Sequence, residues 1–215
     1  MPLTAAAATS LALLLIAYSA AGGDMVVTAG MKPWEGCGEC HGLAGVAPNG
    51  HFPNLAAQDP FYLEKEMEDF RTGLRRNDHG QMGHAARRAR GKTLAAIVRY
   101  FASLPPPPPS PDKLPRTIVR EGRALLATGD RIRKVPACEG CHGPDPTPRF
   151  IAGRLDAQPA AYLEKELEDF RSGRRANDPR RMMQIIARRM SRAQITAVSR
   201  YLASQPHRGT GPSLR

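Results

Sequence analysis

Apolar residues recur along this chain at helical spacing. Between residues 63 and 74 they fall at i, i+4, i+7 and i+11, with charged residues on the other faces, which predicts one amphipathic helix. The stripe consists of Leu63, Met67, Phe70 and Leu74. Residues 94–101 predict a second helix. No stretch alternates convincingly between apolar and polar residues, so the pattern indicates an all-α fold.

The chain also repeats itself. Residues 62–78 read YLEKEMEDFRTGLRRND and residues 162–178 read YLEKELEDFRSGRRAND, so 13 of 17 positions are identical at an offset of 100. A Cys-x-x-Cys-His-Gly motif at residues 37–42 recurs at residues 138–143. Such agreement indicates an internal duplication.

Prolines separate the two copies. Five consecutive prolines, Pro105–Pro109, favour the extended polyproline II conformation and predict a semi-rigid linker over residues 105–115. We therefore expect one domain over residues 25–104 and a second over residues 116–205. The polar tail of residues 206–215 is expected to be flexible.

The first residues resemble an export signal. Leu11 to Ala17 is an apolar run of about seven residues, too short to span a bilayer, and small residues follow at 19–22. We predict a signal peptide over residues 1–21 and a periplasmic location. Because no Lys or Arg precedes the apolar run, an uncleaved membrane anchor is the alternative.

Composition indicates that side chains alone give each domain only a small hydrophobic core. Hydrophobic residues make up 41% of the chain, which excludes a wholly disordered protein, but aromatic residues make up only 6%. Domains of about 80 to 100 residues lie near the lower limit for a self-sufficient core. Something besides side chains is therefore expected to fill the interior.

The Cys-x-x-Cys-His motifs identify what that is. Two cysteines one helical turn apart can form thioethers with one flat ligand, and the histidine after them can coordinate its metal, which is the arrangement of c-type haem. A zinc ribbon would need four ligands in one local unit, a thioredoxin-like pair normally follows a strand, and disulfides would leave both histidines unexplained. We predict two covalent haem c groups held by Cys37, Cys40, Cys138 and Cys141, with His41 and His142 as iron ligands.

The repeat also indicates the sixth iron ligands. At an offset of 101 Met82 corresponds to Met183, and each lies 18 residues before a tyrosine. Met182 remains an alternative to Met183. Met67 is interpreted as core packing, and Met190 is a poor ligand candidate because Ala89 corresponds to it in the first copy. The other candidate histidines are interpreted as loop or tail residues: His51, His79, His84 and His207. Ligation by His and Met saturates the iron, which suits electron transfer and not oxygen or peroxide chemistry.

With both motifs, the repeated block and the placed methionines, about 170 residues of the chain resemble the di-haem cytochrome c4 family. The resemblance implies two class I cytochrome c folds that carry electrons to terminal oxidases, with axial ligands His41, Met82, His142 and Met183. It also implies that a proline carbonyl in residues 52–55 orients the first histidine. The second copy departs from this pattern, because Gly153 stands where the first has Pro53.

Charge is unevenly divided: the total of +11 consists of +2 over residues 25–104, +10 over residues 110–215 and −1 from Asp24. Arginines between residues 174 and 192 surround the Met183 segment, which predicts a docking face for an acidic redox partner or an anionic membrane surface; solubility alone is the alternative. Nucleic-acid binding is not expected in an exported chain without a recognition motif.

An electron carrier is thus the leading interpretation, not an enzyme. A cytochrome subunit of an oxidoreductase, such as flavocytochrome c sulfide dehydrogenase, is the alternative. A haem enzyme in its own right, such as a peroxidase or thiosulfate dehydrogenase, would need an iron whose sixth site is open or is filled by histidine or cysteine, which the duplicated methionine disfavours.

Overall fold

The computed structural model describes residues 30–143 and 151–208, so the predicted signal peptide lies outside the described residues. Within these ranges the chain is helical, as predicted, and the only β pairing is an isolated bridge between Asp130 and Val135. The first half contains η1 (Glu35–Cys37), α1 (Gly38–His41), α2 (Pro60–Thr72), α3 (Gln81–Arg88) and α4 (Gly91–Ser103). The second contains α5 (Arg116–Ala127), α6 (Glu139–His142), α7 (Ala160–Ser172), η2 (Pro179–Arg181), α8 (Met182–Arg189) and α9 (Arg192–Ala203).

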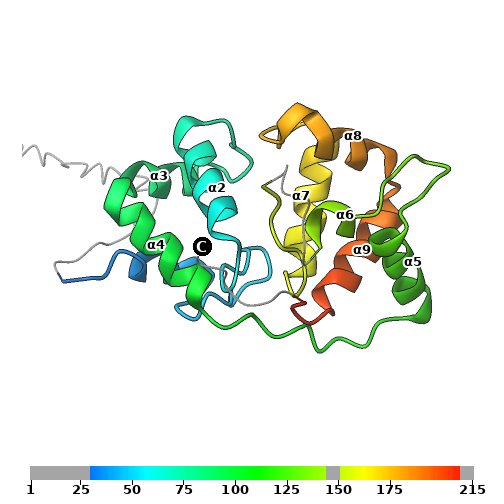
Figure 1. The fold of residues 1–215 in the computed structure, drawn as a ribbon, viewed down its shortest axis with the longest axis horizontal. Helices are drawn as coiled ribbons and strands as arrows, with labels where there is room; N and C mark the ends of the chain where they lie inside the picture. The colour runs from blue at the N-terminus through cyan, green and yellow to red at the C-terminus, as the bar shows by residue number, and fades with distance from the viewer. Residues whose placement is uncertain (1–29, 144–150, 209–215) are drawn as a thin grey trace, which may run out of the picture.

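Figure 1 shows the two halves side by side, with α2 and α7 facing each other across the boundary. Among the described residues, none of the helices combines the length and apolar character needed to cross a bilayer.

Helix α2 is shorter than the apolar stripe suggested. Asp59 caps its start by accepting a hydrogen bond from the Tyr62 backbone N–H at 2.8 Å, and Gly73 ends it in the left-handed conformation. Leu74 therefore lies beyond the helix and is 66% exposed, so its assignment to the stripe was wrong. The charged face was also misassigned in part, since Glu66 and Asp69 are buried.

The second domain has an apolar core built by α5 and α9. Gly122 allows the two helices to approach closely, because a Cβ atom there would lie 2.3 Å from Cβ of Tyr201. The buried residues of this core are Leu125, Leu126, Val135, Leu163, Met190, Ile195, Val198, Tyr201 and Leu202.

The first domain has a smaller apolar cluster. Its buried members are Ala89, Ile97 and Phe101, with Trp34, Leu63, Met67 and Tyr100 packed against them. The Trp34 and Tyr100 rings stack with centroids 4.4 Å apart. So small a core agrees with the expectation that a further group completes the interior of this domain.

The proline segment joins α4 to α5 without forming a helix. Pro107 is buried, and the Ser110 backbone N–H donates to the Ala203 carbonyl of α9 at 2.7 Å. The start of the tail also contacts the second domain, since His207 Nδ1 lies 3.0 Å from the Asp156 carboxylate. The linker thus runs along the second domain.

Candidate haem-binding sites

The first Cys-x-x-Cys-His motif forms a continuous short helical segment. Cys37 ends η1, and Cys40 and His41 belong to α1, so the histidine follows directly on the second thiol. The His41 side chain is buried, and its Nδ1 donates to the Pro53 carbonyl at 2.9 Å. With Nδ1 engaged, Nε2 is the nitrogen left to bind a metal.

The second motif repeats this geometry in spite of its altered loop. His142, at the end of α6, donates from Nδ1 to the Gly153 carbonyl at 2.8 Å. Glycine is required at this position, because a Cβ atom there would lie 2.6 Å from the ring of Tyr62 in the first domain. The second loop therefore packs closely against Tyr62, and it keeps the hydrogen bond to its histidine although glycine replaces proline.

Burial shifts the pKa values of both motifs in the same directions. Burial lowers the pKa of His41 and of His142, although the backbone carbonyl contacts oppose this, so neutral imidazole is favoured. Burial raises the pKa of Cys37 and of Cys138 to about 11, so each is a protonated thiol and not a reactive thiolate. A thioredoxin-like redox pair would need the opposite shift.

A cavity of about 1260 Å³ runs between the two motifs. This exceeds the usual volume of a pocket for one drug-sized ligand, about 300–1,000 Å³. The four cysteines, none of them in a disulfide, line it together with both histidines. This apolar cavity has two thiols and one imidazole, hydrogen-bonded through Nδ1, at each end. It therefore fits two haem c groups. Among the described residues no three His, Cys, Asp or Glu side chains converge as an ion site.

The predicted methionines occupy equivalent helical positions. Met82 is the second residue of α3 and Met183 is the second residue of α8. Asp78 and Asp178 accept hydrogen bonds from backbone N–H groups at the starts of these helices. Both methionines line the cavity. Met182, Met67, Met190, His51, His79 and His84 line it too, so the lining alone does not distinguish them.

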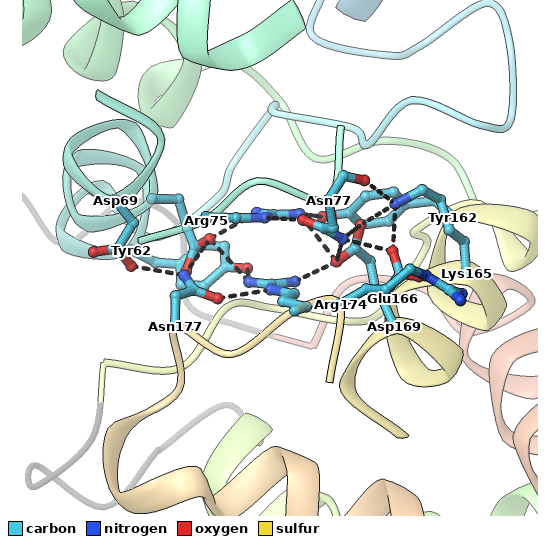
Figure 2. A network of polar contacts seen from close by, with 12 residues as sticks. Tyr62, Asp69, Arg75, Asn77, Tyr162, Lys165, Glu166, Asp169, Arg174 and Asn177 are labelled. Atoms are coloured by element: carbon cyan, nitrogen blue, oxygen red, sulfur yellow. Dashed lines mark hydrogen bonds and ion pairs between the residues drawn. The ribbon is translucent and has the colours of Figure 1, made fainter. Parts of the chain in front are cut away.

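The repeated sequence block has a second role that the sequence analysis missed. Glu66 Oε2 accepts hydrogen bonds from Arg75 at 2.6 Å and from Arg175 of the other domain at 2.9 Å. Glu166 Oε2 likewise lies 2.8 Å from Arg175 and 3.0 Å from Arg75. Figure 2 shows this network of buried charges between the domains.

Further repeated residues complete the network. The Arg75 guanidinium donates to the Tyr162 hydroxyl at 3.3 Å, and Arg175 donates to the Tyr62 hydroxyl at 3.2 Å. The Asn77 side chain donates to Glu166 and Asp169, and Asn177 donates to Glu66 and Asp69. Identity between the two copies did not mark these residues, because the exposed Glu64 and Glu68 are repeated in the second copy as well.

The prediction of an exposed arginine patch is therefore wrong for Arg175. This residue is buried and engaged by both glutamates, and Arg174 contacts Asp169 at 2.7 Å. The other arginines of the predicted patch are exposed: Arg174, Arg180, Arg181, Arg188, Arg189 and Arg192.

A second set of contacts joins the domains next to the histidine loops. The Gln158 side chain accepts from the Asn54 backbone N–H at 2.9 Å and donates to the Asn54 carbonyl at 2.7 Å. The Gln58 side chain likewise accepts from the Arg154 backbone N–H at 2.8 Å and donates to the Arg154 carbonyl at 3.1 Å. The domains therefore pack directly against each other at both haem sites.

No family model matches the chain. Known proteins do resemble it. Cytochrome c4 from Pseudomonas aeruginosa is 37% identical over 195 residues, covering 89% of this chain and 94% of that protein. A thiosulfate dehydrogenase electron acceptor from Thiomonas intermedia is 34% identical, covering 79% of this chain and 78% of that protein.

Among solved structures, reduced cytochrome c4 from Pseudomonas stutzeri has a TM-score of 0.70 and 31% identity, covering 78% of this chain and 92% of that one. Its fold is the tandem class I cytochrome arrangement expected from the sequence. The relatives, the matching fold and the duplicated haem-binding geometry together show that this chain belongs to the di-haem cytochrome c4 family of electron carriers.

Proposed function

We propose that this periplasmic di-haem cytochrome delivers single electrons to a terminal oxidase, with iron ligands His41 and Met82 in the first domain and His142 and Met183 in the second. Cys37 and Cys40, and Cys138 and Cys141, form the thioethers. Each haem stores one electron as its iron cycles between the ferric and ferrous states.

One observation carries the ligand assignment. In each domain a histidine whose Nδ1 donates to a backbone carbonyl shares the cavity with a methionine at the second position of a helix. At the start of each of these helices a backbone N–H donates to an aspartate, Asp78 or Asp178. Met182 is the first residue of its helix and corresponds to Gln81, so it lacks a counterpart in the first domain. Two coordinated axial groups leave no site for oxygen chemistry, which favours a carrier.

Optical spectroscopy tests the ligands. We expect two haems per chain, and we expect Met82→Ala and Met183→Ala each to remove about half of the methionine–iron charge-transfer band of the ferric protein. Met182→Leu is the matched control and should leave the band intact. A band that keeps its full intensity in Met183→Ala, or that falls to about half in Met182→Leu, contradicts the assignment in the second domain.

For the partner we propose an acidic docking surface that meets the second domain. Exposed cations support this: Arg131, Arg133, Lys134, Arg180 and Arg181. Ile132 lies next to Arg131 and Arg133 in the sequence and is 95% exposed, so it can contact an apolar group of the partner. The rate of electron delivery to the oxidase should fall steeply as salt is raised, because exposed charges are screened. A rate independent of salt would exclude this docking mode.

A second candidate is the role of electron acceptor for a thiosulfate-oxidising enzyme, which the name of the Thiomonas intermedia relative suggests. Mixing the oxidised protein with thiosulfate dehydrogenase and thiosulfate distinguishes the two. Rapid reduction of both haems favours this role, and reduction no faster than with thiosulfate alone excludes it.

A further inference from the structure

Each domain reaches across the boundary to the loop that holds the other domain's histidine. The side-chain amide of Gln158 binds both backbone groups of Asn54, and that of Gln58 binds both backbone groups of Arg154, over distances of 2.7 to 3.1 Å. Both glutamines are buried, at 6% and 5% exposure for Gln58 and Gln158. Each clamp is therefore shielded from competing water.

The clamped residue lies directly after the one whose carbonyl receives the histidine. The Pro53 carbonyl and the Asn54 N–H are opposite ends of one planar peptide unit, because a peptide bond joins C=O of one residue to N–H of the next. A continuous chain of hydrogen bonds thus runs from the Gln158 oxygen, through this peptide, to Nδ1 of His41. A second chain of hydrogen bonds runs from the Gln58 oxygen, through the peptide that joins Gly153 and Arg154, to Nδ1 of His142.

Hydrogen bonds in such a chain polarise one another. The Gln158 side-chain oxygen accepts the hydrogen bond from the Asn54 N–H and so polarises this peptide unit. The polarisation places more negative charge on the Pro53 carbonyl oxygen, which becomes a stronger hydrogen-bond acceptor. A stronger acceptor on Nδ1 makes the imidazole a more basic iron ligand, and a more basic ligand stabilises the ferric state.

The backbone before each glutamine is held in an uncommon conformation. Ala57 and Ala157 both have φ of 54°, in the left-handed region that residues with a Cβ rarely adopt. Each is fixed by a hydrogen bond from its own N–H to the end of the last helix of its domain, to Phe101 at 3.1 Å and to Leu202 at 3.0 Å. Strain that is retained in both copies is typical of a residue that positions a functional group.

We propose that Gln58 and Gln158 are crossed positioning residues, each of which lowers the reduction potential of the haem in the opposite domain through that domain's histidine. This rests on the proposed role of His41 and His142 as iron ligands. The two potentials are consequently set by the contact between the domains and not by each domain alone.

Redox titration of the holoprotein, with each haem assigned by its hyperfine-shifted NMR signals, tests the proposal. Gln158→Met removes both hydrogen bonds at similar volume and should raise the equilibrium constant for reduction of the first haem several-fold, with a smaller effect on the second. Gln58→Met should do the reverse. Gln205→Met, outside both clamps, should change neither haem.

Gln158→Glu separates tuning from loosened packing. The carboxylate keeps the acceptor for the Asn54 N–H, loses the donor to the Asn54 carbonyl and adds a negative charge, which by itself opposes reduction of a nearby haem. The deciding measurement is therefore the exchange of the His41 Nδ1 proton in the reduced protein. Tuning predicts that this proton stays as protected in Gln158→Glu as in the wild type and that the first haem becomes no easier to reduce. A mere packing role predicts faster exchange of this proton in both Gln158→Glu and Gln158→Met.

The outcomes keep this inference distinct from the ligand assignment. If wild-type spectra lack histidine-ligated low-spin iron, the proposed ligands and the crossed tuning both fail. If those spectra are as expected but Gln158→Met shifts neither haem, or shifts the haem of its own domain more, only the crossed tuning is overturned.

Discussion

Glu66 shows how much one residue contributes at the domain boundary. Its buried carboxylate accepts hydrogen bonds from two guanidinium groups, those of Arg75 and Arg175. Replacing Glu66 by Gln removes the charge and leaves two buried cations facing one remaining glutamate. Breaking a buried pair on one side costs about 3–5 kcal/mol. We expect Glu66→Gln to lower the free energy of unfolding of the holoprotein by an amount of this order in urea.

Glu68 supplies the control for that measurement. It lies on the same helix and pairs with Arg71, but on an exposed face, where ion pairs contribute little. Glu68→Gln should unfold at nearly the wild-type urea concentration. Equal effects of the two substitutions would show that the buried network does not hold the domains together.

At the scale of elements, the contact between α5 and α9 depends on Gly122. Alanine is favoured over glycine in a helix by about 1 kcal/mol, so propensity alone predicts that Gly122→Ala stabilises the protein. Its new methyl group would, however, lie 2.3 Å from Cβ of Tyr201 and 2.8 Å from the Ala197 carbonyl oxygen. Overpacking of this kind costs about 1–3 kcal/mol. We therefore expect a lower melting temperature, measured by circular dichroism, with Arg123→Ala on the exposed face as control. A higher melting temperature would contradict so close an approach.

The elements also show what the sequence could and could not predict. Helical periodicity found α2 and α4, and the cysteine motifs found both haem sites, because these signals are local. The burial of Glu66 and Asp69 was not foreseen, since their partners Arg175 and Asn177 lie about 110 residues away and on another domain. The end of α2 before Leu74 was missed because the apolar spacing continued past Gly73, whose left-handed conformation ends the helix.

At the scale of the whole molecule, the direct contacts and not the linker should fix how the domains sit. Pro105, Pro106, Pro108 and Pro109 are exposed. Replacing these four by serine makes the linker flexible but leaves the buried charges and both glutamine clamps in place. We expect an unchanged radius of gyration by small-angle X-ray scattering. An increase would show that proline stiffness is needed to keep the domains together.

Acid should separate the domains, because it protonates the buried carboxylates that pair with arginines of both domains. Burial acts to raise the pKa of Glu66, but Arg175 and Arg75 outweigh it and lower the pKa from 4.5 to about 2. The pKa of Glu166 is lowered for the same reasons. A carboxyl whose pKa is depressed by folding stabilises the folded state above its ordinary pKa, and that stabilisation is lost as the pH falls toward the depressed value. The contact should therefore weaken between about pH 4.5 and pH 2.

Within that range we expect the radius of gyration to increase before helical circular dichroism is lost, since each domain keeps its own core and covalent haem. In Glu66→Gln the increase should begin at higher pH, because one of the two shared carboxylates is already gone. Simultaneous loss of helix and compactness in the wild type would show instead that neither domain is stable without the other, and that the shared charges are part of one folding unit.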